Sequence, residues 1–145
     1  MNKCAVIIIV IVLSGINASN IIEKDDQYMT SDNNISVVEE TVLTYKNISA
    51  REAKERIDSE KGIILLDVRT PAEYEEAHIP ETLLIPLDIL DRDAPKMISD
   101  KDATIFIYCR SGRRSITAAK ILISLGYTNV YNLGGIIDWP FETIK

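Results

Sequence analysis

The chain has 145 residues, of which 46% are hydrophobic and 26% are charged, and its formal net charge is −6. This length favours one domain, and the composition is typical of a soluble globular protein. The acidic balance argues against a nucleic-acid-binding protein, because such a protein needs a basic face. Most of the charge lies in residues 1–40, whose six acidic side chains and two lysines give a net charge of −4.

The first residues have the pattern of a secretory signal peptide. Met1-Asn2-Lys3 carries a positive charge, residues 5–13 form an unbroken apolar run, and Ala18 and Ser19 are small residues that fit a cleavage site after Ala18. The apolar run is too short to cross a bilayer comfortably. We therefore predict a signal peptide over residues 1–18 and an exported, periplasmic or extracellular protein without stable membrane insertion after cleavage. The alternative is an uncleaved N-terminal anchor that tethers the protein.

Export would also change the cysteine count. The chain has two cysteines, Cys4 and Cys109, and cleavage would remove the first. A single remaining cysteine cannot form an internal disulfide, so Cys109 becomes a candidate for chemistry. Residues 19–40 are polar and acidic without a clear hydrophobic period, and we predict that they form a flexible linker. The folded domain is then expected over residues 41–145.

After residue 40 the sequence alternates between apolar runs typical of strands and capped helix starts. Ser49 with Glu52, and Thr70 with Glu73, each have the pattern of a capping box. In chain order, the predicted elements are a strand over 41–45, a helix over 49–60, a strand over 63–67, a helix beginning at Thr70-Pro71, a strand over 83–87, an irregular helical stretch over 88–98 interrupted by Pro95, a strand over 104–109, a helix over 115–125 and a strand over 129–133.

The strands are continuously apolar rather than alternating, which indicates a sheet buried on both faces. Strands that alternate with helices favour an α/β fold with a parallel sheet. Ligands of such sheets bind at the carboxyl ends of the strands. Asp67 and Cys109 both end predicted strands, so we expect them on one rim of the domain.

Cys109 opens a turn that contains Gly112 and leads into a helix. Such a turn directs backbone N–H groups and the positive end of the helix dipole towards the sulfur, which favours the nucleophilic thiolate. Arg110, Arg113 and Arg114 in the same turn suit a small anionic substrate. The alternatives are an inert buried cysteine and a solvated cluster of arginines.

The turn Cys109-Arg110-Ser111-Gly112-Arg113-Arg114-Ser115 resembles the active-site loop of the rhodanese family of sulfurtransferases. Two further segments are similar to that family in the same order along the chain: 67–74 with His78-Ile79-Pro80, and 133–136 with Trp139. The resemblance implies a five-stranded parallel sheet flanked by helices on both faces. It also implies that Cys109 takes sulfane sulfur from thiosulfate or another small anionic donor as a persulfide, and passes it to cyanide or a thiol.

In that interpretation Cys109 is the catalytic residue, and Asp67 and Arg69 either support the loop or form a purely structural ion pair. Arg114 could pair with the Asp67 rim instead of binding substrate. The sequence has no metal-ligand cluster or phosphate-binding glycine loop, so we infer no metal and no cofactor. The substrate-binding residues are then Arg110, Ser111, Gly112, Arg113, Arg114 and Ser115.

Three other residues receive structural roles. Glu73 is predicted to be a helix cap rather than a catalytic acid, and His78 a hydrogen-bonding residue rather than a general base. Trp139 is predicted to pack in the core. The family often has Gly before the histidine and Pro-Gly-Ala after it, whereas Ala77 and Pro80-Glu81-Thr82 stand here.

Other functions remain open at this point. The domain could be a persulfide carrier or a rhodanese-like binding module for a specific protein partner, and the same Cys109 would serve a carrier. A cysteine phosphatase or arsenate reductase is a weaker alternative, because the loop of the phosphatases runs seven residues from Cys to Arg. In this sequence Arg114 is the sixth residue counted from Cys109, which leaves the loop sized for sulfur rather than phosphorus.

Overall fold

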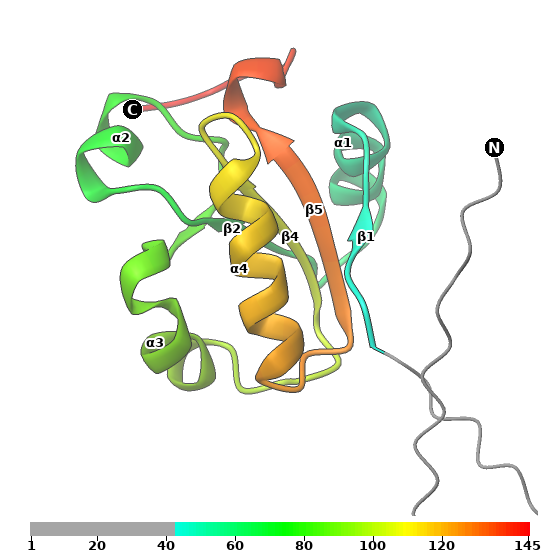
Figure 1. The fold of residues 1–145 in the computed structure, drawn as a ribbon. Helices are drawn as coiled ribbons and strands as arrows, with labels where there is room; N and C mark the ends of the chain where they lie inside the picture. Colours follow the sequence, from blue (N-terminus) through cyan, green and yellow to red (C-terminus); the bar gives the residue numbers. More distant parts are fainter. Residues whose placement is uncertain (1–42) are drawn as a thin grey trace, which may run out of the picture. The chain divides into compact units, whose positions relative to one another are not determined.

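The computed structural model describes residues 43–145. The predicted signal peptide over 1–18, the predicted linker over 19–40 and the start of the first predicted strand lie outside these residues. The elements in chain order are β1 (Lys46–Asn47), α1 (Ala50–Ser59), β2 (Ile64–Asp67), α2 (Pro71–Glu76), β3 (Leu83–Leu84), the 3₁₀ turn η1 (Leu87–Ile89), α3 (Leu90–Met97), β4 (Thr104–Cys109), α4 (Arg113–Ser124), β5 (Asn129–Gly135) and the 3₁₀ turn η2 (Ile136–Asp138) (Figure 1).

The five strands form one parallel sheet in the order β1-β5-β4-β2-β3, with β4 in the centre. Its two faces are covered by different helices (Figure 1). Ile105, Ile107 and Cys109 of β4 belong to the core cluster that includes residues of α3 and α4. Phe106 and Tyr108 point to the opposite face, where α1 packs. The predicted α/β fold with helices on both faces is confirmed.

The first strand differs from its prediction over 41–45. Residues 43–45 are not part of a strand, and β1 consists of Lys46 and Asn47, which pair with β5 at the edge of the sheet. The strand is short because α1 begins almost at once, with Ser49 as its N-cap. The Ser49 hydroxyl accepts a hydrogen bond from the Glu52 N–H at 3.2 Å, which is the first half of the predicted capping box. The complete box forms only at Thr70.

The region 83–98 is more helical than predicted. The strand over 83–87 shrinks to β3, although the N–H groups of Ile85 and Leu87 still donate to the carbonyls of Asp67 and Val68, and Pro86 leads into the 3₁₀ turn. Pro95 lies inside α3 and does not interrupt it. The carbonyl that would have accepted a Pro95 N–H belongs to Asp91, which is exposed, so water can satisfy that group.

Two boundaries next to the predicted site also differ. The helix predicted over 115–125 begins at Arg113, because Gly112 adopts a left-handed conformation with φ of 94°. The strand predicted over 129–133 extends to Gly135. It accommodates one extra residue at Leu133, because Ile107 pairs with Asn132 whereas the next residue of β4 pairs with Gly134. Both differences lengthen the regular structure around Cys109. No helix within residues 43–145 is long and apolar enough to span a membrane.

Candidate active site

Cys109 and Asp67 lie at the carboxyl ends of the neighbouring strands β4 and β2. The pairing register places Asp67 beside Tyr108, one residue before the cysteine. The sequence therefore predicted their common rim correctly. The rim is the edge of the sheet from which the turn into α4 departs (Figure 1).

Backbone amides of the turn surround the sulfur. The N–H of Gly112 donates to the Cys109 Sγ at 3.1 Å, and the hydroxyl oxygen of Ser115 lies 3.8 Å from the same atom. The left-handed backbone at Gly112 folds the turn back over the strand end and starts α4 at once. We refer to the backbone of residues 109–115 as the amide cradle.

The cradle shifts the acidity of the thiol. Burial is the largest influence and opposes ionisation, but hydrogen bonds from the N–H groups of Ser115, Gly112 and Ser111 outweigh it. The Ser115 hydroxyl is the smallest of these named influences. The net result is that the pKa of Cys109 lies below its ordinary value. The thiolate is the nucleophilic form, so the cradle prepares the sulfur for attack.

The sulfur is less accessible than the sequence suggested. Cys109 is 1% exposed, although the arginines of the turn predicted a small anionic substrate beside it. At the end of β5, Gly135 packs closely against the turn that follows Cys109. A Cβ atom at Gly135 would lie 2.6 Å from the Arg110 carbonyl oxygen and 2.8 Å from the Ser111 Cα. The inert-cysteine alternative is not supported, since the surrounding peptide groups face the sulfur.

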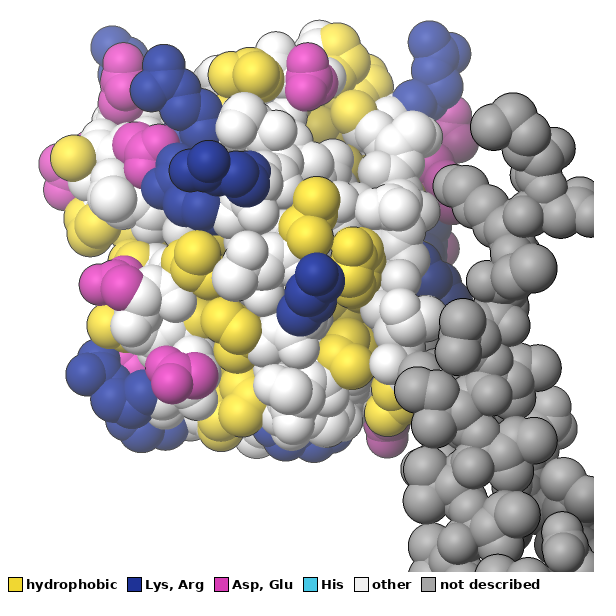
Figure 2. All heavy atoms as spheres, viewed as in Figure 1, with side chains coloured by type: hydrophobic (Ala, Val, Ile, Leu, Met, Phe, Trp, Pro, Cys, Tyr) yellow, Lys and Arg dark blue, Asp and Glu magenta, His cyan; other side chains and the backbone are white. Residues whose placement is uncertain are grey.

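Two arginines of the turn point into solvent. Arg110 and Arg113 are exposed, and neither forms a salt bridge within the part of the chain that the structure describes. Figure 2 shows Lys and Arg side chains gathered over the N-terminal end of α4, with acidic side chains beside them. Unpaired guanidinium groups next to a buried sulfur can recognise a small anion.

Arg114 has a different environment. Its guanidinium forms a two-pronged salt bridge with Glu73, with distances of 2.8 and 2.7 Å. Sequence reasoning allowed a pairing of Arg114 with the Asp67 rim, and the structure corrects the partner to Glu73. Glu73 also completes the capping box with Thr70, which confirms its predicted role as a helix cap. Hydrogen bonds from Arg114 lower the pKa of Glu73 from 4.5 to about 2.

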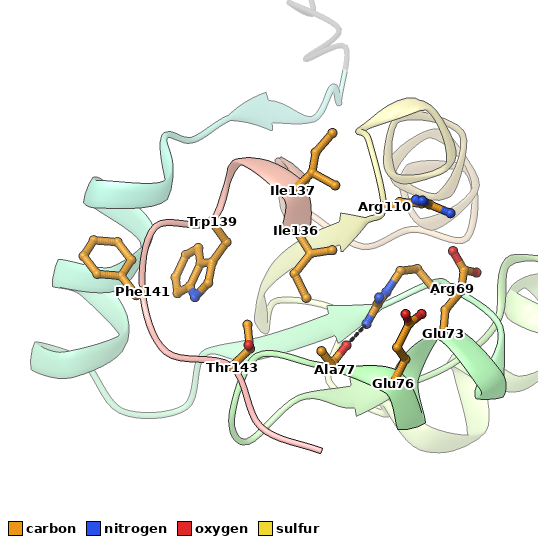
Figure 3. Close-up of a pocket in the computed structure, with 10 residues that line it drawn as sticks. All are labelled: Arg69, Glu73, Glu76, Ala77, Arg110, Ile136, Ile137, Trp139, Phe141 and Thr143. Carbon is orange, nitrogen blue, oxygen red and sulfur yellow. Dashed lines mark hydrogen bonds between the residues drawn. The ribbon is translucent and has the colours of Figure 1, made fainter.

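Asp67 is fully paired with Arg69. The Arg69 side chain donates to both carboxylate oxygens, and its backbone N–H donates to Oδ1 at 2.9 Å. The same guanidinium reaches the Ala77 carbonyl at 2.7 Å, a contact drawn in Figure 3. Both residues are buried. This geometry makes the pair a brace between the end of β2 and the end of α2.

His78 and Trp139 have structural contacts, as predicted. The His78 Nδ1 makes a hydrogen bond with the Tyr74 carbonyl at 2.9 Å, and the two rings stack with centroids 3.7 Å apart. Trp139 is buried in the cluster on the α1 face of the sheet, together with Phe106. Neither side chain contacts the sulfur through a hydrogen bond.

Asn132 was missed by sequence reasoning. Its side-chain oxygen lies 2.7 Å from the Ser115 hydroxyl and accepts the Gly134 N–H at 3.2 Å. The available signal was a polar residue near the carboxyl end of the strand, two positions before the Gly134-Gly135 pair. The sequence alone could not show that this strand lies next to β4.

A cavity of about 370 Å³ opens beside the turn (Figure 3). Arg110 and Arg69 line it together with the exposed Glu76, and Ile136 and Trp139 form part of its apolar wall. Cys109 is not among the lining residues. The cavity is large enough for a small organic molecule or ion next to the cradle. Residues 43–145 contain no group of His, Cys, Asp or Glu side chains that could hold a metal ion.

We compared the chain with protein families, curated proteins and solved structures. A family model described as a rhodanese-like domain matches residues 49–140. A sulfurtransferase of Allochromatium vinosum is 38% identical over 93 residues, which are 63% of this chain and 85% of that protein. Thiosulfate sulfurtransferase PspE of Escherichia coli is 36% identical over 80 residues, 55% of this chain and 77% of the relative. A solved structure of rhodanese with anions from E. coli has a TM-score of 0.55 and 35% identity, and the match covers 57% of this chain and 98% of that one.

Proposed function

The chain belongs to the rhodanese-like domain family of sulfurtransferases, and from this premise we propose that it transfers sulfane sulfur from thiosulfate through a persulfide on Cys109. The acceptor in this proposal is cyanide or a thiol. The observation that carries the proposal is the amide cradle, in which the Gly112 N–H lies 3.1 Å from the sulfur. A thiolate held in this way is a nucleophile without the help of a separate base.

The proposed reaction has two displacements. In the first, the Cys109 thiolate attacks the outer sulfur of thiosulfate, a new S–S bond forms, and the old S–S bond breaks with its electron pair leaving on sulfite. In the second, cyanide attacks the outer sulfur of the persulfide, and thiocyanate leaves while the thiolate is restored. Each step conserves charge and electrons, and neither needs an oxidant or a metal.

Recognition of the donor is assigned to Arg110 and Arg113. Both side chains are exposed, stand in the turn that carries Cys109, and have no salt-bridge partner among the described residues. Arg114 is the weaker candidate, because Glu73 occupies its guanidinium. The E. coli neighbour was solved with anions, which supports an anionic donor for this chain as well.

The direct test is a steady-state assay of the purified protein with thiosulfate and cyanide that measures thiocyanate. We expect turnover with thiosulfate and none with p-nitrophenyl phosphate, which separates sulfur transfer from phosphatase chemistry. Hydrolysis of the phosphate ester without thiocyanate formation would refute the proposal. A stable persulfide that cyanide does not discharge would indicate a carrier for a protein partner, and a chain that thiosulfate does not modify would indicate a binding module.

We also propose export, on the basis of the signal-peptide pattern over residues 1–18. Mass spectrometry of the protein recovered from cells should give a chain that begins at Ser19 in the exported fraction. A chain that begins at Met1 in the membrane fraction would favour the uncleaved anchor instead.

A further inference from the structure

The Ser115 hydroxyl is a crowded hydrogen-bonding group directly beside the reactive sulfur. Ser115 is completely buried, and its oxygen lies 2.7 Å from the Asn132 Oδ1, 2.8 Å from the Gly112 carbonyl oxygen and 3.3 Å from the Gly134 carbonyl oxygen. The Cys109 sulfur is farther away, at 3.8 Å. A hydroxyl has one proton to donate, so these acceptors compete for it.

The Gly134 N–H fixes the orientation of the Asn132 amide, because it donates to Oδ1 at 3.2 Å. In this orientation the Asn132 Nδ2 donates to the Asn47 Oδ1 at 3.0 Å. An amide rotated by 180° would place its NH₂ against the Gly134 N–H and lose the hydrogen bond from that group. Asn132 therefore presents an acceptor, not a donor, to Ser115.

We propose that Asn132 is a positioning residue for sulfur transfer, because it draws the Ser115 proton away from the Cys109 sulfur and leaves the thiolate to the peptide N–H groups. A thiolate with one hydrogen bond fewer is more basic and more nucleophilic, since intrinsic nucleophilicity falls as the thiol becomes more acidic. This inference deepens the proposed function by assigning a residue that tunes the same sulfur.

Charged groups around the sulfur would be left in place by changes at Asn132. Arg114 of α4 interacts electrostatically with Cys109 and is itself paired with Glu73 of α2. Asp67 and Arg69 pair with each other at the end of β2. The remaining charged side chains of the turn are Arg110 and Arg113. A change in thiol acidity in the uncharged variant Asn132→Leu can therefore be traced to the hydrogen-bond network.

The test measures the thiol pKa of the full chain from the pH dependence of its alkylation by iodoacetamide. We expect Asn132→Leu to lower this pKa by up to about one unit, because the sulfur then competes for the Ser115 proton with only the Gly112 and Gly134 carbonyls. Asn132→Asp keeps the acceptor and adds a negative charge, so the pKa should rise. Asn129→Leu is the matched control on the same strand, since the Asn129 side chain contacts the Asp102 carbonyl away from the site. It should leave the pKa unchanged.

A second comparison tests whether Asn132 acts through Ser115. In a Ser115→Ala background, Asn132→Leu should no longer shift the pKa of Cys109. Two results with Asn132→Leu would overturn the inference: a pKa shift that persists when Ser115 is replaced by alanine, or no pKa shift when Ser115 is present. Shifts of the same sign for Asn132→Leu and Asn132→Asp would also overturn it. Asn132→Ala removes the same acceptor without adding bulk and keeps the test valid if the leucine variant does not fold. Because alkylation needs no sulfur donor, this result is independent of whether thiosulfate proves to be a substrate.

Discussion

The amide cradle consists of backbone groups, whereas the edge of the sheet around it carries charged side chains. We call these side chains, Asp67, Arg69, Glu73 and Arg114 together with Arg110 and Arg113 of the turn, the charged rim. In the cradle, the sulfur of Cys109 is contacted by backbone N–H groups and one hydroxyl. On the rim, charged side chains mostly contact one another. Asp67 holds Arg69, and Glu73 holds Arg114.

In the proposed function, this difference separates the activation of the sulfur from the recognition of the donor. Peptide groups fixed by a strand end and a helix start cannot move away, so they stabilise the thiolate permanently. The paired charges of the rim brace the ends of β2, α2 and α4. Only Arg110 and Arg113 of the turn are left unpaired among the described residues, and they are the groups free to meet an incoming anion.

The strongest test of the cradle is removal of its sulfur. We expect Cys109→Ser to abolish thiocyanate formation, because the serine hydroxyl does not ionise at neutral pH and cannot form a persulfide. The variant should keep its fold, since the hydroxyl is smaller than the thiol and can accept the Gly112 N–H. Circular dichroism checks the fold and the thiocyanate assay checks the chemistry. Residual turnover above the background without enzyme would contradict the assignment.

The next largest effect is expected at the buried brace of the rim. Asp67→Asn leaves the Arg69 guanidinium buried without a counter-charge, which should lower the free energy of unfolding by about 3–5 kcal/mol. Asp58→Asn is the matched control, because Asp58 pairs with Lys54 on the exposed surface of α1. Its effect should stay within about 0.5 kcal/mol. Denaturant unfolding measures both, and equal losses would mean that Asp67 is not a brace.

The sequence was sufficient for the cradle and insufficient for the rim. Cys109, the turn with Gly112 and the helix that follows are adjacent in the chain, so local rules predicted the amide groups around the sulfur. The pairing of Glu73 with Arg114 joins residues that are 41 positions apart. It depends on which loops the strand order brings together, and that order is a property of the whole sheet.

The same reason explains the two other misses near the site. Asn132 reaches Ser115 only because β5 lies next to β4. The extra residue at Leu133 shifts the register so that Cys109 pairs with Gly135, which packs against the turn at Arg110 and Ser111. A bulge depends on the match between two strands, and neither strand alone contains a signal for it.

A smaller effect is expected from changes to the arginine that we assign to donor recognition. Arg110→Ala should raise the KM for thiosulfate about tenfold or more, because a charge-assisted contact with the anion is lost. The transfer from persulfide to cyanide should slow less. Arg51→Ala is the control, since Arg51 is exposed on α1 and also has no salt bridge among the residues described. Single-turnover kinetics separate the two half-reactions, and equal slowing of both would remove Arg110 from donor recognition.

The smallest effect concerns the pH dependence of the outer ion pair. The folded-state pKa of Glu73 is about 2, below the ordinary 4.5, so its stabilising contribution is present above pH 4.5 and is lost as the pH falls from 4.5 towards 2. The difference in unfolding free energy between the wild type and Glu73→Gln should be about 1 to 2 kcal/mol at pH 7, since solvent screens a partly exposed pair, and should vanish near pH 2.

Glu60→Gln provides the comparison for this last prediction, because Glu60 also pairs with an arginine but is fully exposed at the end of α1. Its variant should show a smaller difference at pH 7, and neither variant should change the alkylation rate of Cys109 as strongly as the changes at Asn132. If Glu73→Gln altered the alkylation rate of Cys109 as much as Asn132→Leu did, the charged rim would also control the reactivity of the sulfur. The distinction between a cradle that activates the thiol and a rim that stabilises the fold would then be wrong.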